Sequence, residues 1–158
     1  MFIRKIITAD NETIARIIRN SLLEFNAAKP GTVYFDESTD HLSDLFKEKT
    51  SAYFVMEINK EIAGGAGYFP TKGLPSKTCE LVKMYLSERF RGNGYGQMLL
   101  QKCMEEAKKE GYLKMYLESM PELVKAIPMY EKNGFKHIEG PLGNSGHTGC
   151  DIWMIRDL

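Results

Sequence analysis

A glycine-rich turn limits the choice of fold for this chain more than any other segment. Arg91-Gly92-Asn93-Gly94-Tyr95-Gly96 joins an apolar run at 80–86 to an amphipathic run at 97–110, which predict a strand and a helix. Alternate glycines remove side chains that would hold a ligand away from the backbone. Free amides at the helix start would point outward as donors to an anion, and the forked Arg91 guanidinium suits phosphate. Residues 91–96, the cradle, are therefore expected to bind a pyrophosphate.

Two common phosphate-binding motifs do not match the cradle. A dinucleotide-binding fingerprint needs G-x-G-x-x-G after an early strand, whereas the spacing here is G-x-G-x-G past the middle of the chain. A nucleoside-triphosphate loop ends in Gly-Lys-Ser/Thr, whereas Gly96 is followed by Gln97. The turn alone leaves phosphate binding and an ordinary tight turn as equal alternatives.

Length, charge and cysteine content narrow the class of protein. The 158 residues, 43% of them hydrophobic, predict one domain spanning 1–158. Lysine plus arginine equals aspartate plus glutamate at 21 each, so we expect neither a nucleic-acid nor a membrane-surface partner. The three cysteines, Cys79, Cys103 and Cys150, lack metal-site spacing and favour a reducing compartment, the cytoplasm. With no apolar run long enough to span a bilayer, the protein is expected to be soluble.

Periodicity gives an order of strands and helices. Strands are predicted at 2–8, 51–58, 61–69, 78–86, 112–118, 135–139 and 151–155, and helices after Asp10, at 42–46, at 97–110 and at 121–132. The strands at 78–86 and 112–118 flank one helix and should run parallel. Glycines 64–67 lie inside a strand, where they favour a bulge or close packing over ligand approach.

Two segments in this order resemble a known family. Val82–Leu100, V-K-M-Y-L-S-E-R-F-R-G-N-G-Y-G-Q-M-L-L, resembles motif A of the GNAT superfamily of acyl-CoA N-acyltransferases, with Arg91, Gly94 and Gly96 matching R/Q-x-x-G-x-G/A. Ala126–Phe135, A-I-P-M-Y-E-K-N-G-F, resembles the end of its motif B. Element order agrees over nearly the whole chain. The resemblance implies an α/β (α+β) fold: a mixed, mostly antiparallel sheet of about six or seven strands, with a splayed parallel pair and helices on both faces.

The resemblance also implies a coenzyme A site. The cradle would bind the pyrophosphate, and pantetheine would lie between the parallel strands ending near Leu86 and Glu118. The strand before the cradle must then have unpaired backbone groups on one side. Many members carry an asparagine where this chain has Leu123, and Ser119 or Asn133 could replace its hydrogen bond. The cofactor-binding residues predicted on this basis are Met84, Tyr85, Leu86, Arg91, Gly92, Asn93, Gly94, Tyr95, Gly96, Ser119 and Asn133.

Amine acylation needs two further groups. An amine with a pKa of about 10 is protonated at neutral pH, so a base must take its proton before it attacks a thioester. Glu80, placed by period-two alternation on the face of Met84 and Leu86, matches the base of some family members; its alternative role is an ordinary strand-end carboxylate. Tyr130 matches the family's general acid for the leaving thiolate, beside the alternative of a buried core tyrosine.

The acceptor side of the site is less well defined in the sequence. The segment 24–48 has six acidic residues, which would suit a cationic amine, and Glu118 either contacts substrate or is exposed. The loop 143–150 is expected to be a flexible lip over the acceptor or a plain surface loop. Its His147 and Cys150 are too few ligands to indicate a metal, and no metal is expected.

Together these patterns predict an enzyme that transfers an acetyl group from acetyl-CoA to a primary amine of an amino acid-like or polyamine-like small molecule by direct attack. The alternatives are a non-catalytic acyl-CoA-binding or sensing module and a protein lysine or N-terminal acetyltransferase. Coenzyme release with a panel of amines would separate these functions. The sequence leaves open a longer acyl donor and a homodimer.

Overall fold

One seven-stranded sheet forms the centre of the molecule. The computed structural model describes all residues, 1–158. The strand order is β1-β2-β3-β4-β5-β7-β6, and every neighbouring pair is antiparallel except β4 and β5. The strands are β1 Phe2–Lys5, β2 Ala52–Ile58, β3 Glu61–Phe69, β4 Thr78–Leu86, β5 Lys114–Ser119, β6 Lys136–Ile138 and β7 Ile152–Asp157. The mixed sheet with one parallel pair confirms the predicted fold class.

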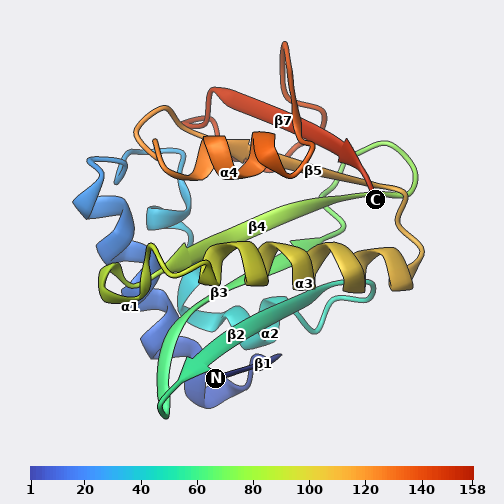
Figure 1. Cartoon of the computed structure of the whole chain (residues 1–158). Helices are drawn as coiled ribbons and strands as arrows, with labels where there is room; N and C mark the ends of the chain where they lie inside the picture. Colours follow the sequence, from blue (N-terminus) through green and yellow to red (C-terminus); the bar gives the residue numbers. More distant parts are fainter.

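Helices cover both faces of this sheet (Figure 1). They are α1 Asn11–Glu24, α2 Leu42–Leu45, α3 Tyr95–Glu110 and α4 Ala126–Lys132. Short 3-10 turns lie at Thr8–Asp10, Val33–Phe35, Glu37–His41 and Glu88–Phe90. The alternation of side chains along β2 sends Phe54 and Met56 to the core beneath α3 and α4, and Tyr53 and Val55 to the core beneath α1 and α2. None of the helices combines the length and apolar character needed to cross a membrane.

Glycines in β3 allow strands to approach closely. A Cβ on Gly65 would lie 2.5 Å from the Tyr53 ring, and one on Gly64 would lie 2.1 Å from the Tyr85 carbonyl oxygen. The pairing of β3 with β4 also shifts between Gly65 and Gly67. The prediction that the glycines at 64–67 favour a bulge or close packing is therefore confirmed.

The helix predicted at 121–132 is shorter than expected. Residues 121–125 form turns, with the Leu123 amide bonded to Met120 O and the Ala126 amide bonded to Leu123 O, and α4 begins at Ala126. Pro128 explains the difference, because proline lacks an amide hydrogen and its ring clashes with the carbonyl four residues earlier. A start at Ala126 leaves Pro128 in the first turn, where the missing donor costs nothing.

Candidate active site

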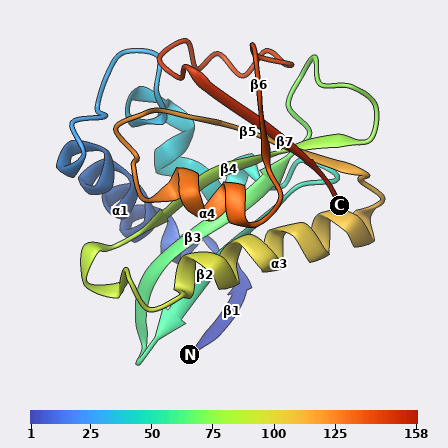
Figure 2. The same cartoon turned by 45° about the horizontal axis from the view of Figure 1, so that its top comes forward.

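The parallel strands β4 and β5 separate beside the cradle. Their pairing runs from Thr78↔Lys114 to Leu81↔Leu117 and then stops, although β4 continues to Leu86. Figures 1 and 2 show the two strands diverging, with α3 and α4 on the same face of the opening. The second half of β4 therefore has unpaired backbone on its β5 side, which confirms the expectation of a splayed pair.

A bulge in β4 lies at the start of this opening. Between the pairs Gly67↔Val82 and Gly65↔Tyr85, two residues of β4, Lys83 and Met84, stand opposite the single residue Ala66. Lys83 has a φ of 51°, a left-handed conformation that is rare for a lysine. Such a bulge bends the strand and reverses the facing of the residues that follow it.

The bulge makes the predicted facing of Glu80 wrong. Its neighbour Leu81 packs in the core beneath α3, and so do Met84 and Leu86 beyond the bulge. Glu80 therefore points to the opposite face, because side chains alternate along the regular part of the strand. Counting every second residue from Glu80 to Met84 gives the wrong face of the sheet, because the extra residue of the bulge shifts the alternation by one position.

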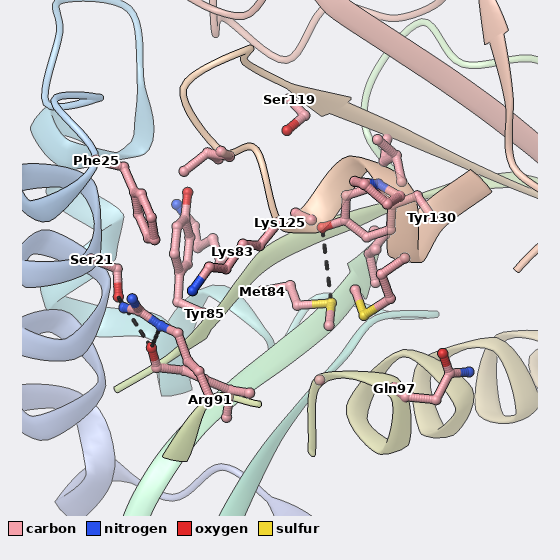
Figure 3. Close-up of a pocket in the computed structure, with 18 of the residues that line it drawn as sticks. Ser21, Phe25, Lys83, Met84, Tyr85, Arg91, Gln97, Ser119, Lys125 and Tyr130 are labelled. Carbon is pink, nitrogen blue, oxygen red and sulfur yellow. Dashed lines mark hydrogen bonds between the residues drawn. The ribbon is translucent and has the colours of Figure 1, made fainter. Parts of the chain in front are cut away.

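A cavity of about 540 Å³ fills the opening between the strands (Figure 3). Predicted cofactor residues that line it are Met84, Tyr85, Leu86, Arg91, Gly92, Gly94, Gly96 and Ser119. Asn93, Tyr95 and Asn133 were also predicted but are not among the lining residues. Asn133 instead exchanges hydrogen bonds of 2.6 and 2.7 Å with Gln97, which links α4 to α3.

The cradle presents free backbone donors to this cavity. No turn, loop or cap hydrogen bond begins at an amide between residues 92 and 97, and the first amide bonded back is that of Met98, to Gly94 O. Gly92 and Gly94 both have a φ of 79°, and Gly94 is the N-cap of α3. Glycine adopts this left-handed conformation at little cost, so the chain can turn its amides outward.

The Arg91 side chain faces α1 rather than the free end of the cradle. Its guanidinium donates to Leu86 O at 2.8 Å and to the Ser21 hydroxyl at 3.0 Å (Figure 3). It also donates to Glu24 at 2.6 Å. These bonds link the cradle to α1. They also occupy the guanidinium donors that were expected from the sequence to bind phosphate.

Two lysines that the sequence reading missed also line the large cavity. Lys125 precedes α4 and Lys132 ends it, and both are exposed. Their spacing of seven residues places them on one helical face, a signal that was available in the sequence. They add positive charge to a cavity that already contains the free amides.

Tyr130 lies on the wall of the cavity that α4 provides. It is 7% exposed, and its hydroxyl points toward the sulfur of Met84, 4.0 Å away (Figure 3). Burial raises the pKa of this hydroxyl well above its ordinary value. The group therefore remains a proton donor at neutral pH.

Glu80 lines a second, smaller cavity on the opposite face of the sheet. This cavity has a volume of about 50 Å³. Glu80 is 3% exposed and accepts a hydrogen bond from the Thr71 hydroxyl. Burial raises its pKa to about 7; the Thr71 bond opposes the shift and the nearby Glu118 charge adds to it. A carboxyl group with this pKa exchanges protons readily near neutral pH.

The two cavities meet where β4 and β5 part. Both are lined by Leu81, Lys83, Tyr85, Glu118, Ser119 and Leu123. Leu123, at the position where many GNAT members have asparagine, therefore lies at the junction, and so does the buried Ser119. Glu118 accepts hydrogen bonds from the hydroxyls of Tyr116, at 2.8 Å, and Ser145.

Two loops close the small cavity from outside. The His147 ring Nε2 lies 2.7 Å from Asp36 Oδ2, which also accepts a bond of 3.1 Å from Lys83 Nζ. The Gly149 amide donates to Gly31 O at 2.9 Å, and so fixes the loop 143–150 against the segment after α1. The loop thus forms a lip over the small cavity and is held at several points.

Only one acid of the 24–48 segment forms an ion pair with residues that line this small cavity. Asp40 pairs with Arg19, Asp44 with Lys47 and Glu24 with Arg91, whereas Asp36 contacts Lys83 and His147. Of the six acidic residues that were expected to suit a cationic amine, Asp36 is therefore the one that remains a candidate for this role.

A group of possible metal ligands lies in the same cavity. Glu80, Glu118 and His147 offer atoms within 4.8 Å of one another, and Cys150 is not part of this group. Each of the three already has a hydrogen-bond partner, and the Lys83 ammonium acts on the charge of Glu80. A second cation would be repelled by that ammonium, so the group suits a hydrogen-bonding ligand better than a metal ion.

The splayed sheet, the outward amides and the two joined cavities define a class of protein. The family model Acetyltransferase (GNAT) family matches residues 18–135. The chain therefore belongs to the GNAT acetyltransferase family, and the family resemblance seen in the motifs is confirmed.

Particular relatives agree with this assignment. Uncharacterized N-acetyltransferase YjgM of Escherichia coli (strain K12) is 38% identical over 156 residues, which cover 98% of this chain and 93% of that protein. An acetyltransferase of the GNAT family from Staphylococcus aureus Mu50 has a TM-score of 0.88 at 19% identity, over 99% of this chain and 98% of that one. YncA from Salmonella typhimurium, solved with its cofactor acetyl-CoA, has a TM-score of 0.79 at 21% identity, over 100% and 94%. The two structures share the fold.

Proposed function

We propose that this acetyltransferase moves an acetyl group from acetyl-CoA to a primary amine of a small molecule by direct attack. The observation that carries the proposal is the meeting of two cavities at the β4 bulge. Tyr130, a group that stays protonated, lines the larger one, and Glu80, a carboxyl that titrates near neutrality, lines the smaller one. A thioester at the junction would have an acid on one side and a base on the other.

The larger cavity suits coenzyme A. The amides of residues 92–97 would bind the pyrophosphate, and Lys125 and Lys132 would add charge for its phosphate groups. The backbone of Met84 and Tyr85, beyond the last pair with β5, would bond the pantetheine amides. Acetyl-CoA is the donor that we assign, since the Salmonella protein with the same fold was solved with it.

The chain's own groups can account for each proton in the transfer. Glu80 takes a proton from the acceptor ammonium, directly or through water, and the freed amine attacks the thioester carbon. Backbone amides near Met84 stabilise the oxyanion while the new C–N bond forms. Tyr130 donates a proton to the sulfur as the C–S bond breaks, and the nitrogen, which still carries one extra proton after the attack, gives that proton to water. Exchange with solvent then restores both side chains, and the products are the N-acetyl amine and free coenzyme A.

The size of the smaller cavity favours a small acceptor over a protein. Its volume is about 50 Å³, and the Asp36–His147 contact lies across its outer side. A protein lysine or N-terminus would need an open groove there. A pure binding module would not require a titrating Glu80 opposite Tyr130. We further propose that the chain acts as one domain, because strands from both its ends join one sheet, and the three free cysteines fit a cytoplasmic location.

Calorimetry with acetyl-CoA and thiol release with a panel of amines test the proposal. We expect binding of acetyl-CoA, and release of coenzyme A only when a suitable small amine is present, with a product heavier by one acetyl group in mass spectrometry. Acetylation of lysine-containing peptides without turnover of small amines would favour a protein modifier. Binding without turnover of any acceptor would favour a sensing module.

A further inference from the structure

Lys83 is a buried cation with hydrogen-bonding capacity to spare. Its side chain is 4% exposed, and it lines both cavities at their junction (Figure 3). An ammonium group carries three donors. Lys83 Nζ uses one of them, in the bond of 3.1 Å to Asp36 Oδ2. Because unused donors on a buried charge are costly, a ligand acceptor at this place would be stabilising.

The Asp36 carboxylate is shared between two partners. The oxygen that accepts from Lys83 lies closer to the His147 ring, at 2.7 Å, than to the ammonium. Burial by itself would raise the pKa of Asp36. The hydrogen bond with His147 and the positive charge of Lys83 together lower it by more, so the pKa of Asp36 lies below its ordinary value. Asp36 is therefore ionised, and it neutralises Lys83 only in part.

Another part of the small-cavity lining is acidic, with His147 beside the two carboxylates. Glu118 is bonded to the hydroxyls of Tyr116 and Ser145, and Glu80 is bonded to that of Thr71. Oxygens of Glu80 and Glu118 lie within 4.8 Å of each other. The cavity thus has a negative side made by these two carboxylates and a positive side made by Lys83.

We propose that the acceptor is an amino acid or another compound bearing both an amine and a carboxylate, with Lys83 binding the carboxylate and Glu118 positioning the ammonium beside Glu80. This inference rests on the proposed function and specifies its acceptor. A zwitterion matches both sides of the cavity at once. A diamine would place a second positive charge near Lys83, whereas a simple amine would leave the Lys83 donors unused.

A matched set of three acceptors tests the proposal with the full-length protein and acetyl-CoA. Alanine carries the carboxylate, alaninamide replaces it with a neutral amide, and ethylamine lacks it; valine, valinamide and 2-methylpropylamine form a second set with a larger side chain. We expect kcat/KM for the acid to exceed that for the other two members of its set by about tenfold to a hundredfold, the range of one charge-assisted hydrogen bond. The amide has a less basic amine than the acid, so a preference for the acid over the amide cannot come from more free base.

Substitutions connect the preference to Lys83. Lys83→Met should raise KM for the acid and bring the acid-to-amine ratio of kcat/KM close to one. Lys108→Met, at an exposed lysine of α3, should keep the wild-type ratio. Asp36→Asn removes the carboxylate that competes for Lys83, so the ratio should stay or increase. Thermal melting and acetyl-CoA calorimetry check that each variant is folded.

The outcomes separate this inference from the proposed function. If amides and simple amines are acetylated as well as the acids, or if Lys83→Met slows all acceptors equally, the carboxylate assignment is wrong while small-amine acetylation stands. If no small amine of either set or of the wider panel is acetylated, the proposed function fails and the inference fails with it. The wild-type ratio decides the question even if Lys83→Met does not fold.

Discussion

Glu80 and Glu118 lie on neighbouring strands, next to the point where the pairing of these strands ends, and their carboxylate oxygens lie within 4.8 Å of each other. Two like charges at this distance in a mostly buried place disfavour simultaneous ionisation. Glu80 is buried whereas Glu118 is only partly buried, and burial is the main cause of the raised pKa of Glu80. Burial and this repulsion together fit Glu80 for proton exchange near neutral pH.

The rate of acetyl transfer should rise with pH through about 7, because Glu80 acts as a base only when ionised and its pKa is about 7. Glu80→Gln should remove this part of the profile and lower kcat/KM by about a hundredfold. A pH series of kcat/KM at fixed ionic strength measures both effects. An unchanged profile in Glu80→Gln would show that another group takes the proton.

Glu80→Gln should also change how stability depends on pH. The folded-state pKa of about 7 lies above the ordinary 4.5, so the native state binds the Glu80 proton more tightly than the unfolded state does. The stability that this proton provides is fully present below pH 4.5 and is lost as pH rises through 7. At pH 8 the variant should be more stable than wild type by about 3 kcal/mol, and at pH 4 the gain should vanish. Urea unfolding at both pH values measures the difference.

Tyr130→Phe should leave acetyl-CoA binding intact and lower kcat by about a hundredfold, since the hydroxyl donates a proton only when the thiolate leaves. Tyr112→Phe is the matched control, because the Tyr112 hydroxyl bonds Thr50 away from both cavities. Calorimetry and steady-state kinetics separate the two effects. Equal kcat for wild type and Tyr130→Phe would contradict the assignment of Tyr130 as the acid.

Gly94→Val should weaken acetyl-CoA binding by about tenfold or more, because a β-branched residue resists the φ of 79° that turns the cradle amides outward. Gly111→Val is matched to it: Gly111 has a φ of 103°, also has open space around it, and caps the other end of α3. Both changes should cost stability, but only the first should raise the Kd for acetyl-CoA. Equal loss of affinity in the two variants would mean that strain in α3, and not the cradle, controls binding.

Local patterns gave the elements that form the larger cavity. The strand at 78–86 was predicted with the bounds that β4 has, and the helix at 97–110 was predicted to end where α3 ends, before Gly111. Both signals depend on neighbours in the chain: a short apolar run favours a strand, and glycine favours the left-handed cap. The late start of α4 was also readable in principle, since Pro128 by itself excludes a helix that begins at 121.

The face of the sheet on which Glu80 lies could not be predicted from such local patterns. Alternation along β4 breaks at Lys83, and the extra residue there is defined by the register with β3, a strand that pairs from elsewhere in the chain. The role of Arg91 shows the same limit. The sequence favoured phosphate as the partner of its guanidinium, whereas in the folded chain that group binds Ser21 and Glu24 of α1.

The sequence by itself determined the family of this protein and the backbone geometry of the cradle, because the cradle is six consecutive residues between a strand and a helix and its geometry follows from local backbone preferences. Only the tertiary structure decided which groups meet at the small cavity. Asp36, Glu80, Glu118 and His147 come from four segments that are distant in the chain. Packing of two loops over a bulged, splayed sheet brings them together, and no spacing in the sequence encodes that contact.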